Sequence, residues 1–361
     1  MSAVFKRKFL SIFPNFKRVL LGLVLASVIF VSVFLLLLSK QHQISLTTVP
    51  DLILGNTQKL KSYQNRTNIL LLGIGGENHD GGNLTDTMIV VSIDFNKKDA
   101  LLLHVPRDIW IGSLKDKINA AYEVGESKNK GDGFVLAKAT VEEIIGIPIH
   151  YAVLIDFAGF KDMIDTVGGI DVEIPEAFTD PLYPIAGREN DLCSGDKTFA
   201  CRYETVTFTK GHEHMDGTRA LKYVRSRHAA GATGTDFSRG QRQELVLAAL
   251  KNKLLSNKIL FNPAVLWKLR TIAAKTTSSD LKTTELLLLG RAFLGGTPTI
   301  RSDGLTQDIP EKGENGLLIH PSPALYDGKW VLIPKDSDFV QIGKYVSCLL
   351  DPVAHCEQWL K

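Results

Sequence analysis

The sequence at residues 68–105 is NILLLGIGGENHDGGNLTDTMIVVSIDFNKKDALLLHV. It contains three short apolar runs rich in leucine, isoleucine and valine, at 68–74, 87–94 and 100–105. Runs of this length, bounded by segments rich in glycine, asparagine and aspartate, are typical of buried β-strands. We therefore expect these three runs to form the centre of a sheet.

Helical and extended patterns alternate after this stretch. The order is a helical pattern at 133–146, an apolar run at 150–156, a helical pattern at 157–167 and an extended segment, IDVEIP, at 170–175. Gly168 and Gly169 are placed to end the second helix, because glycine is favoured just beyond a helix C-terminus. The alternation predicts an α/β fold, a three-layer α-β-α domain with a mixed central sheet.

The remaining segments extend this domain in both directions. Residues 175–210, with three prolines and two cysteines, are expected to form a long surface excursion that borders the active site. Apolar helices follow 243 and continue to 295, and 297–316 has the composition of a linker. A strand pair around GLLIH and KWVLIP and a helix at 340–349 then complete the chain.

The first 39 residues have the pattern of a membrane anchor. Residues 19–39 are uncharged and mostly apolar, which is long enough to cross a bilayer as a helix and longer than the apolar region of a cleaved signal peptide. Five basic residues precede this span and only Lys40 follows it closely, so the positive-inside rule predicts a cytoplasmic N-terminus. We expect a single-pass protein of the cell membrane whose remaining residues, from 40 onward, are extracytoplasmic.

The expected domain order is therefore as follows: a cytoplasmic basic tail at 1–18, a transmembrane helix (signal anchor) at 19–39, a stalk at 40–65, a catalytic domain at 66–296 and a C-terminal α/β extension at 297–361.

Charge excludes a general polyanion-binding surface. The formal net charge is +3, but five positive charges lie before residue 19, and the rest of the chain carries 37 basic and 39 acidic residues. Any anion binding must then come from local clusters of basic residues. The same balance, together with an extracytoplasmic location, excludes a DNA-binding regulator, and we expect no nucleic-acid partner.

The four cysteines fall into two close pairs, Cys193 with Cys201 and Cys348 with Cys356. An extracytoplasmic location allows disulfides to persist, so we expect two local disulfides. Metal ligation is the competing use, but neither pair has the two-residue spacing of a zinc knuckle.

A carboxylate and a guanidinium group are expected to meet at one edge of the sheet. Asp86 lies at the start of one predicted strand, and Arg107 and Asp108 follow the next. Adjacent antiparallel strands would bring these positions to the same edge. A structural ion pair at the sheet edge is the alternative. The intervening glycine-rich loop matches neither a Walker motif nor a dinucleotide fingerprint.

A second polar cluster lies at 215–243, MDGTRALKYVRSRHAAGATGTDFSRGQRQ. The pattern predicts a helix that ends near Arg225 and Arg227 and a second helix that begins at Thr235 or Asp236. Arg239, Arg242 and Gln243 should lie near one face of the second helix. Arginine forks and a helix N-terminus both favour phosphate, although a solvated basic helix face is the alternative.

The motifs that carry this chemistry occur in a consistent order along residues 66–260. They are LTDTMIVVSID, HVPRDIWI, KINAAYE, HYAVLIDFAGFKDMIDTVGGIDVEIP, and GTRALKYVRSRH with TDFSRGQRQ. Together they resemble the LytR-CpsA-Psr family of membrane-anchored enzymes of the bacterial cell envelope. The resemblance implies a phosphotransferase that moves a phospho-glycopolymer from a polyprenyl pyrophosphate carrier to peptidoglycan or another wall acceptor, with Mg²⁺ or Mn²⁺ on the pyrophosphate.

The resemblance also implies roles for individual residues. Asp86 matches the family's metal-binding aspartate, Arg107 the arginine that contacts the pyrophosphate, and Arg225 and Arg227 the paired phosphate-binding arginines. Asp236, Arg239 and Gln243 match the polar residues of the last motif, in which the aspartate is a candidate for activating the acceptor hydroxyl.

The metal site departs from the family pattern at one position. The family commonly has a second metal-binding aspartate just after the first strand, where this chain reads GIGG at 73–76. Glu77 or Asp80 from the following loop is the candidate replacement. Mg²⁺ requires only one or two carboxylates when substrate oxygens and waters complete its shell.

A lipid-linked donor also requires an apolar surface for its tail. Residues 244–260, ELVLAALKNKLLSNKIL, are candidate lining, and ordinary core packing is the alternative. Two other functions remain open from the sequence: a pyrophosphatase acting on the same donor, and a wall glycopolymer-binding protein without catalysis.

The topology is testable with a reporter. Alkaline phosphatase fused after Lys361 is expected to be active in cells, because the positive-inside rule places that end outside the cytoplasm. Fusion at the same position to a protein that fluoresces only in the cytoplasm provides the control. A fluorescent fusion without phosphatase activity would overturn the predicted location.

Overall fold

The computed structural model describes residues 57–76, 82–188, 190–234, 236–294, 299–308, 315–336 and 338–360. The predicted basic tail, the predicted span at 19–39 and most of the stalk lie outside these ranges. None of the helices in the described ranges is long and apolar enough to cross a membrane.

The chain divides into two compact units. The smaller comprises residues 1–59 and 282–295, and its described elements are η2 (Thr57–Lys59) and α11 (Thr283–Leu294). The larger comprises residues 60–281 and 296–361 and contains every other described element.

A six-stranded mixed sheet forms the centre of the larger unit, in the order β11-β6-β1-β2-β3-β12. Its strands are β1 (Arg66–Ile74), β2 (Thr85–Asp94), β3 (Asp99–His104), β6 (Tyr151–Asp156), β11 (Thr277–Ser279) and β12 (Thr299–Gly304). β1, β2 and β3 pair antiparallel, whereas β6 runs parallel to β1 and β12 runs parallel to β3. The prediction of an α/β fold with a mixed central sheet built on the three apolar runs is confirmed.

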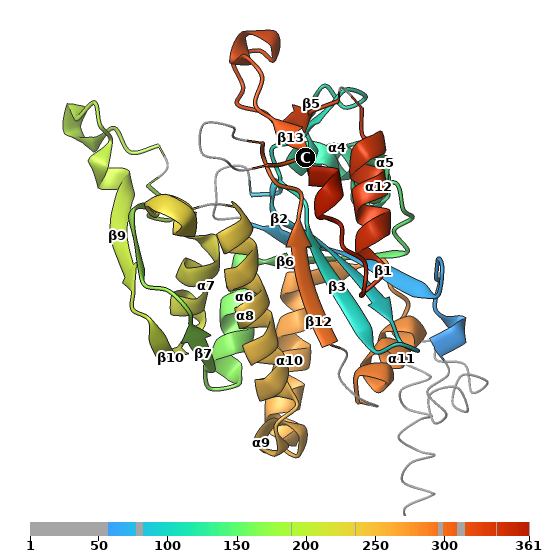
Figure 1. Cartoon of the computed structure of the whole chain (residues 1–361). Coiled ribbons are helices and arrows are strands. Elements are labelled where there is room, and N and C mark those ends of the chain that lie inside the picture. The colour runs from blue at the N-terminus through green and yellow to red at the C-terminus, as the bar shows by residue number, and fades with distance from the viewer. Residues whose placement is uncertain are drawn as a thin grey trace, which may run out of the picture. The chain divides into compact units, whose positions relative to one another are not determined.

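Helices lie on both sides of this sheet (Figure 1). In the larger unit they are α4 (Ala121–Lys128), α5 (Asp132–Ile145), α6 (Phe157–Thr166), α7 (Gly217–Arg225), α8 (Asp236–Leu254), α9 (Asn257–Leu260), α10 (Pro263–Thr276) and α12 (Val340–Leu349). α5 and α12 lie on one side and α6, α8 and α10 on the other. α6 ends at Gly168 and Gly169, both with positive φ, as the sequence predicted.

Short strands and turns complete the larger unit. The paired strands are β4 (Trp110–Ile111) with β5 (Asp116–Lys117), β7 (Ile170–Ile174) with β10 (Gly211–Met215), β8 (Phe178–Pro184) with β9 (Tyr203–Phe208), and β13 (Leu318–Ile319) with β14 (Ile333–Pro334). The 3-10 helices are η3 (Ile118–Ala120), η4 (Cys193–Gly195), η5 (Ala200–Arg202), η6 (Gly231–Gly234), η8 (Pro323–Leu325) and η9 (Glu357–Leu360).

The surface excursion predicted at 175–210 is more ordered than its composition suggested. β8 and β9 form an antiparallel hairpin, and Phe178 and Phe208 stack at its base with 5.0 Å between ring centroids. Cys193 and Cys201 form a disulfide near the hairpin tip, and Cys348 and Cys356 form the second one. Both predicted disulfides are present.

The linker predicted at 297–316 is corrected by the structure. Residues 299–304 form β12 at the edge of the central sheet, although their sequence, TIRSDG, is mostly polar. Side chains further along, including Leu305, Leu318 and Val346, join the same hydrophobic cluster as Leu70 and Leu101 of the sheet. The C-terminal residues therefore share the main hydrophobic core.

A buried charge network attaches β12 to the sheet. Asp99, with a side chain 6% exposed, accepts hydrogen bonds from Arg66 at 2.8 Å and from Arg301 at 2.8 and 3.0 Å. Arg66 also donates to the carbonyl oxygens of Ser92 and Leu350, and Arg301 donates to that of Leu349. This network explains why the mostly polar strand β12 stays at the sheet edge, because Arg301 of β12 is paired with buried Asp99.

Replacement of Asp99 by alanine should destabilise the protein by about 3 kcal/mol, because it leaves Arg66 buried without its carboxylate. The free energy of unfolding, measured with urea, checks this value. Glu173→Gln, at an exposed position of β7, is the matched control and should unfold like the parent. Equal stability of the Asp99→Ala protein would show that the network does not hold β12.

Candidate active site

The β2–β3 register places Asp86 opposite Arg107. Ile89 pairs with His104, and Val105 N–H donates to Met88 O, so the two chains continue antiparallel beyond the sheet. Three residues further on, Arg107 Nη1 donates to Asp86 Oδ1. The sequence predicted this meeting of a carboxylate and a guanidinium group at one sheet edge, and the structure confirms it.

The C-terminus of α7 supplies two further arginines. Asp216 caps the N-terminus of this helix, and Arg225 is its last residue. Ser226 then leaves the helical conformation, so Arg225 and Arg227 reach the same region from a helix end and an extended segment. Arg225 Nη2 lies 3.8 Å from Asp86 Oδ2. This geometry agrees with the predicted helix end.

The Arg225 guanidinium group packs over two aromatic rings. Its Cζ lies 4.3 Å from the centroid of Phe157, the first residue of α6, and 5.9 Å from that of Tyr183 in β8. Guanidinium groups over ring faces are stabilised by the ring quadrupole. Burial raises the pKa of Tyr183, and the opposing charge of Arg225 does not reverse this shift, so the phenol stays protonated.

Asp180 fixes the backbone of the second arginine. Its side chain is fully buried, and its Oδ2 accepts N–H bonds from Arg227 at 2.8 Å and from His228 at 3.3 Å. Its Oδ1 accepts from Leu182 N at 3.0 Å. One carboxylate of the β8–β9 hairpin thus determines the course of the chain that carries Arg227.

Asp108 balances part of the positive charge. Its carboxylate lies 2.8 Å from Lys117 Nζ, 3.6 Å from Arg107 Nε and 3.7 Å from Arg227 Nη2. Burial raises the pKa of Asp108, but the hydrogen bond from Lys117 and the charges of the two arginines outweigh burial and hold the pKa below its ordinary 3.8. Asp108 is therefore an anion at neutral pH.

The first two turns of α8 complete the site. Gly240 lies so close to β3 that a Cβ atom there would be 2.9 Å from the His104 ring, and this approach brings the helix start onto the sheet. Arg239 and Gln243, four residues apart, line the same cavity as Asp86. The sequence placed Arg242 near them. Arg242 is instead buried, and it donates to the carbonyl oxygens of Ser226 at 2.6 Å and Thr233 at 2.8 Å.

These side chains surround a cavity of about 220 Å³. Its lining consists of Asp86, Thr87, Arg107, Pro184, Val224, Arg225, Arg227, His228, Arg239 and Gln243. Arg107 Nε is buried and makes no hydrogen bond to the described residues, although the Asp108 carboxylate lies 3.6 Å away. Among the residues that the structure describes, Asp86 is the one carboxylate in this lining.

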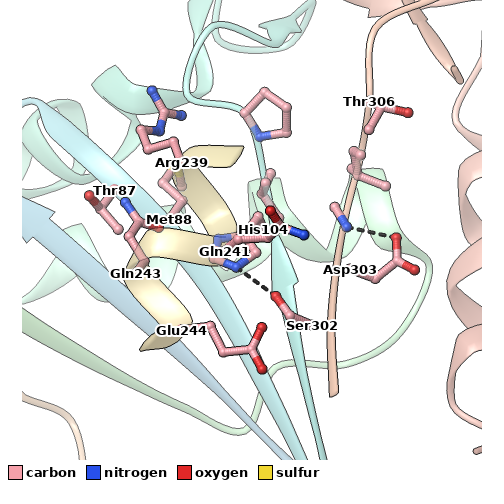
Figure 2. A pocket seen from close by; sticks show the side chains of 14 residues that line it. Thr87, Met88, His104, Arg239, Gln241, Gln243, Glu244, Ser302, Asp303 and Thr306 are labelled. Carbon is pink, nitrogen blue, oxygen red and sulfur yellow. Dashed lines mark hydrogen bonds between the residues drawn. The ribbon is translucent and has the colours of Figure 1, made fainter. Parts of the chain in front are cut away.

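A smaller cavity of about 80 Å³ adjoins the first and shares Thr87, Arg239 and Gln243 with it. Figure 2 shows Gln241 and Glu244 of α8 opposite His104 of β3 and the β12 residues Ser302 and Asp303. His104 Nε2 lies 3.1 Å from Ser302 Oγ, and Asp303 Oδ1 accepts from Tyr345 OH at 2.7 Å. The mispredicted strand β12 thus contributes a wall beside the site.

The side chains of three predicted site residues lie outside what the structure describes. Glu77 and Asp80 fall within residues 77–81, and Asp236 is described only as the first backbone position of α8. Sequence reasoning missed Asp180 and His228 as parts of the site, and it predicted Arg242 but not its buried position. Asp180 had no local sequence signal, because it lies in a proline-rich segment. The Arg227 N–H from which it accepts a hydrogen bond is 47 residues further along the chain.

Comparison with known proteins gives a consistent result. The LytR_cpsA_psr family model matches residues 39–320. The polyisoprenyl-teichoic acid–peptidoglycan teichoic acid transferase TagV of Bacillus subtilis is 33% identical over 220 residues, covering 59% of this chain but only 49% of TagV. The similarly named TagU of Oceanobacillus iheyensis is 27% identical over 292 residues, covering 80% of this chain and 78% of TagU.

The fold has solved counterparts. The crystal structure of B. subtilis TagV is similar with a TM-score of 0.53 and 28% identity, covering 79% of this chain and 97% of that one. Because the family model extends over most of the sequence, including both halves of the arginine site, the chain belongs to the LytR_cpsA_psr family.

Proposed function

We propose that this protein is a phosphotransferase that moves a phosphate-linked glycopolymer from a polyprenyl pyrophosphate carrier to peptidoglycan or another wall acceptor. The observation that carries the proposal is the convergence of Arg107, Arg225 and Arg227 with Asp86 on one cavity. Similarity to TagV and TagU, which are named as transferases of teichoic acid to peptidoglycan, supports the same reaction class.

The charge of the cavity suits a pyrophosphate diester. Attack on phosphorus by an acceptor hydroxyl builds negative charge on the phosphoryl oxygens and on the leaving phosphate, and fixed cations stabilise that charge most in a partly enclosed site. The guanidinium groups of Arg107, Arg225 and Arg227 supply such donors, with Arg239 and Gln243 beside them. Arginine forks can bind two phosphoryl oxygens at once.

A divalent cation, Mg²⁺ or Mn²⁺, fits this donor set as part of the proposal. Asp86 is a hard oxygen ligand at the cavity wall, 27% exposed, and oxygen ligands are those that Mg²⁺ prefers. When bound, the metal would neutralise charge on the pyrophosphate. Glu77 or Asp80 would supply a second carboxylate. In the structure, Asp86 instead contacts Arg107 and Arg225, and a phosphate ligand would draw those guanidinium groups away from it.

Asp236 is proposed to accept the proton of the acceptor hydroxyl. It begins α8, three residues before Arg239, which lines the cavity. The smaller cavity adjoining the arginine cavity offers amide, carboxylate and hydroxyl groups among apolar ones, which are suited to a sugar next to the phosphate. The adjacent cavities would thus hold phosphate and sugar side by side.

The predicted location completes the proposal. A signal anchor at 19–39, with its N-terminus in the cytoplasm, would keep the site on the outer side of the membrane, where a lipid-linked donor meets the wall. α8 and α9, which contain residues 244–260, are the proposed lining for the polyprenyl tail.

Product analysis tests the reaction directly. The full-length protein, incubated with a short-chain polyprenyl pyrophosphate sugar and peptidoglycan fragments, should yield polyprenyl phosphate and an acceptor that carries the sugar phosphate, in equal amounts. Mass spectrometry of both products is the measurement. Free sugar phosphate that forms equally well without acceptor would indicate a pyrophosphatase, and binding without any product would indicate a non-catalytic glycopolymer-binding protein.

Replacing Arg107, Arg225 or Arg227 by lysine should lower transfer by roughly 10 to 1000-fold, because the charge stays but the two-pronged fork is lost. Initial rates at saturating donor check this range. Arg291→Lys, at an exposed position of α11, is the matched control and should transfer at the parent rate. Parent rates for all three site variants would place the active site elsewhere.

Asp86→Ala should abolish Mg²⁺-dependent transfer, and Glu77→Ala or Asp80→Ala should weaken it, because each removes a proposed ligand. Calorimetry of Mg²⁺ binding in the presence of a pyrophosphate analogue separates metal binding from activity. Asp86→Asn keeps the shape of the side chain and removes only its charge. If Asp86→Ala binds Mg²⁺ with the parent affinity, Asp86 is a structural partner of Arg107 and not a ligand.

A further inference from the structure

The C-terminal part of α8 and the helices α9 and α10 carry charge of one sign only. Residues 245–279 contain six basic residues and no acidic residue, whereas the chain beyond residue 18 has slightly more acids than bases. The basic residues are Lys251, Lys253, Lys258, Lys268, Arg270 and Lys275. Lys253 lies 3.9 Å from Asp171, but Lys258, Lys268, Arg270 and Lys275 are solvent-exposed.

Large apolar side chains are exposed in the same place. Phe261 is 80% exposed and Trp267 66%, and Leu260 and Leu266 are 37% and 41% exposed. α9 and α10 are joined by only two residues, Phe261 and Asn262, and the Asn262 side chain caps α10 by accepting from Val265 N. The four apolar side chains are therefore gathered around one tight turn, which we call the α9–α10 tip.

The two faces of α10 have different surroundings. Val265 and Leu269 pack against the hydrophobic cluster that includes Ile259 and Val246. Leu266, Trp267 and Arg270 lie on the other face, as their spacing of three and four residues requires, and Arg270 Cζ lies 5.2 Å from the Trp267 ring centroid. The outward face thus combines exposed apolar and basic groups.

We propose that the α9–α10 tip docks onto a bilayer surface that contains anionic phospholipid. Leucine, phenylalanine and tryptophan beside lysine and arginine form the pattern by which interfacial helices insert an apolar face while their cations meet lipid headgroups. A soluble polyanion would be recognised by the cations alone and would leave Phe261 and Trp267 in water. The exposed aromatic groups therefore favour a lipid surface over an anionic wall polymer.

The inference does not depend on the proposed reaction, because it uses only the side chains of α9 and α10 and the turn between them. The tip is also distinct from the arginine cavity. Arg239 and Leu254, at opposite ends of α8, are separated by about 22 Å at the helical rise of about 1.5 Å per residue. Variants at the tip should therefore leave the cavity intact.

Fluorescence quenching in lipid discs tests this contact. The protein has no free cysteine, so Ala264→Cys in α10 can be labelled alone with an environment-sensitive fluorophore, in the full-length chain embedded in phosphatidylglycerol-containing discs. Doxyl-labelled lipid should quench this probe. The matched control probe at Val135→Cys on α5, a position 62% exposed, should remain unquenched.

Charge and apolar variants separate the two parts of the interaction. Lys258→Gln/Lys268→Gln/Arg270→Gln should lower the ratio of docked to free tip by about fivefold per charge, or about 100-fold in all. Removing the exposed Lys128, Lys130 and Lys197 in the same way should change nothing. Phe261→Ser/Trp267→Ser, at exposed positions that the fold does not need, should also abolish quenching.

Three results would overturn the proposal. The first is equal quenching of the probes at 264 and 135. The second is quenching that is the same in discs of phosphatidylcholine alone and is unaffected by the triple charge variant. The third is a probe at 264 that responds to soluble polyglycerol phosphate but not to doxyl lipid, which would assign the tip to an anionic polymer.

Discussion

Mutual repulsion among three guanidinium groups is the constraint that this site must satisfy. Two cations 8 Å apart repel by about 2 kcal/mol at an effective dielectric constant near 20. Asp86, which contacts Arg107 and Arg225, and Asp108, which lies near Arg107 and Arg227, offset this repulsion. The two negative charges are fewer than the four positive charges of the three arginines and Lys117. The cavity therefore keeps an excess of positive charge that can bind an anion.

The scaffold holds these charges by means that differ for each arginine. The antiparallel register of β2 and β3 positions Arg107. Arg225 is positioned by the end of α7 and by packing over the Phe157 ring. Arg227 is positioned by its backbone N–H, which donates to buried Asp180. The guanidinium group of Arg242 donates hydrogen bonds to carbonyl oxygens of the connecting loop. Distant segments of the chain therefore cooperate in one small site, and the hairpin β8–β9 is as much a part of it as the sheet.

The central sheet could be predicted from sequence because its strands are apolar on both faces, which leaves few alternatives for Leu70, Val90 or Leu101. The Asp86–Arg107 contact followed from that prediction, since register carries two neighbouring strands to one edge. β12 was missed because its stability comes from Arg301 meeting Asp99, a contact between residues 202 positions apart. No local pattern in TIRSDG indicates such a partner.

The arginine cluster was predictable in composition but not in detail. The break between α7 and α8 was marked by small residues and an N-cap type, so both helix ends were correct. Helical spacing alone could not distinguish Arg239, which lines the cavity, from Arg242, which turns inward to bond Ser226. That choice depends on which backbone carbonyl groups the loop presents, and only the folded chain determines it.

The most direct test of the central claim is a crystal structure of the protein with a short-chain polyprenyl pyrophosphate. The account predicts that both phosphates lie in the cavity between α7, α8 and the β2–β3 edge, with Arg107, Arg225 and Arg227 bonded to phosphoryl oxygens in place of their present carboxylate partners. A pyrophosphate bound at another surface, with Arg107 and Arg225 still on Asp86, would contradict it.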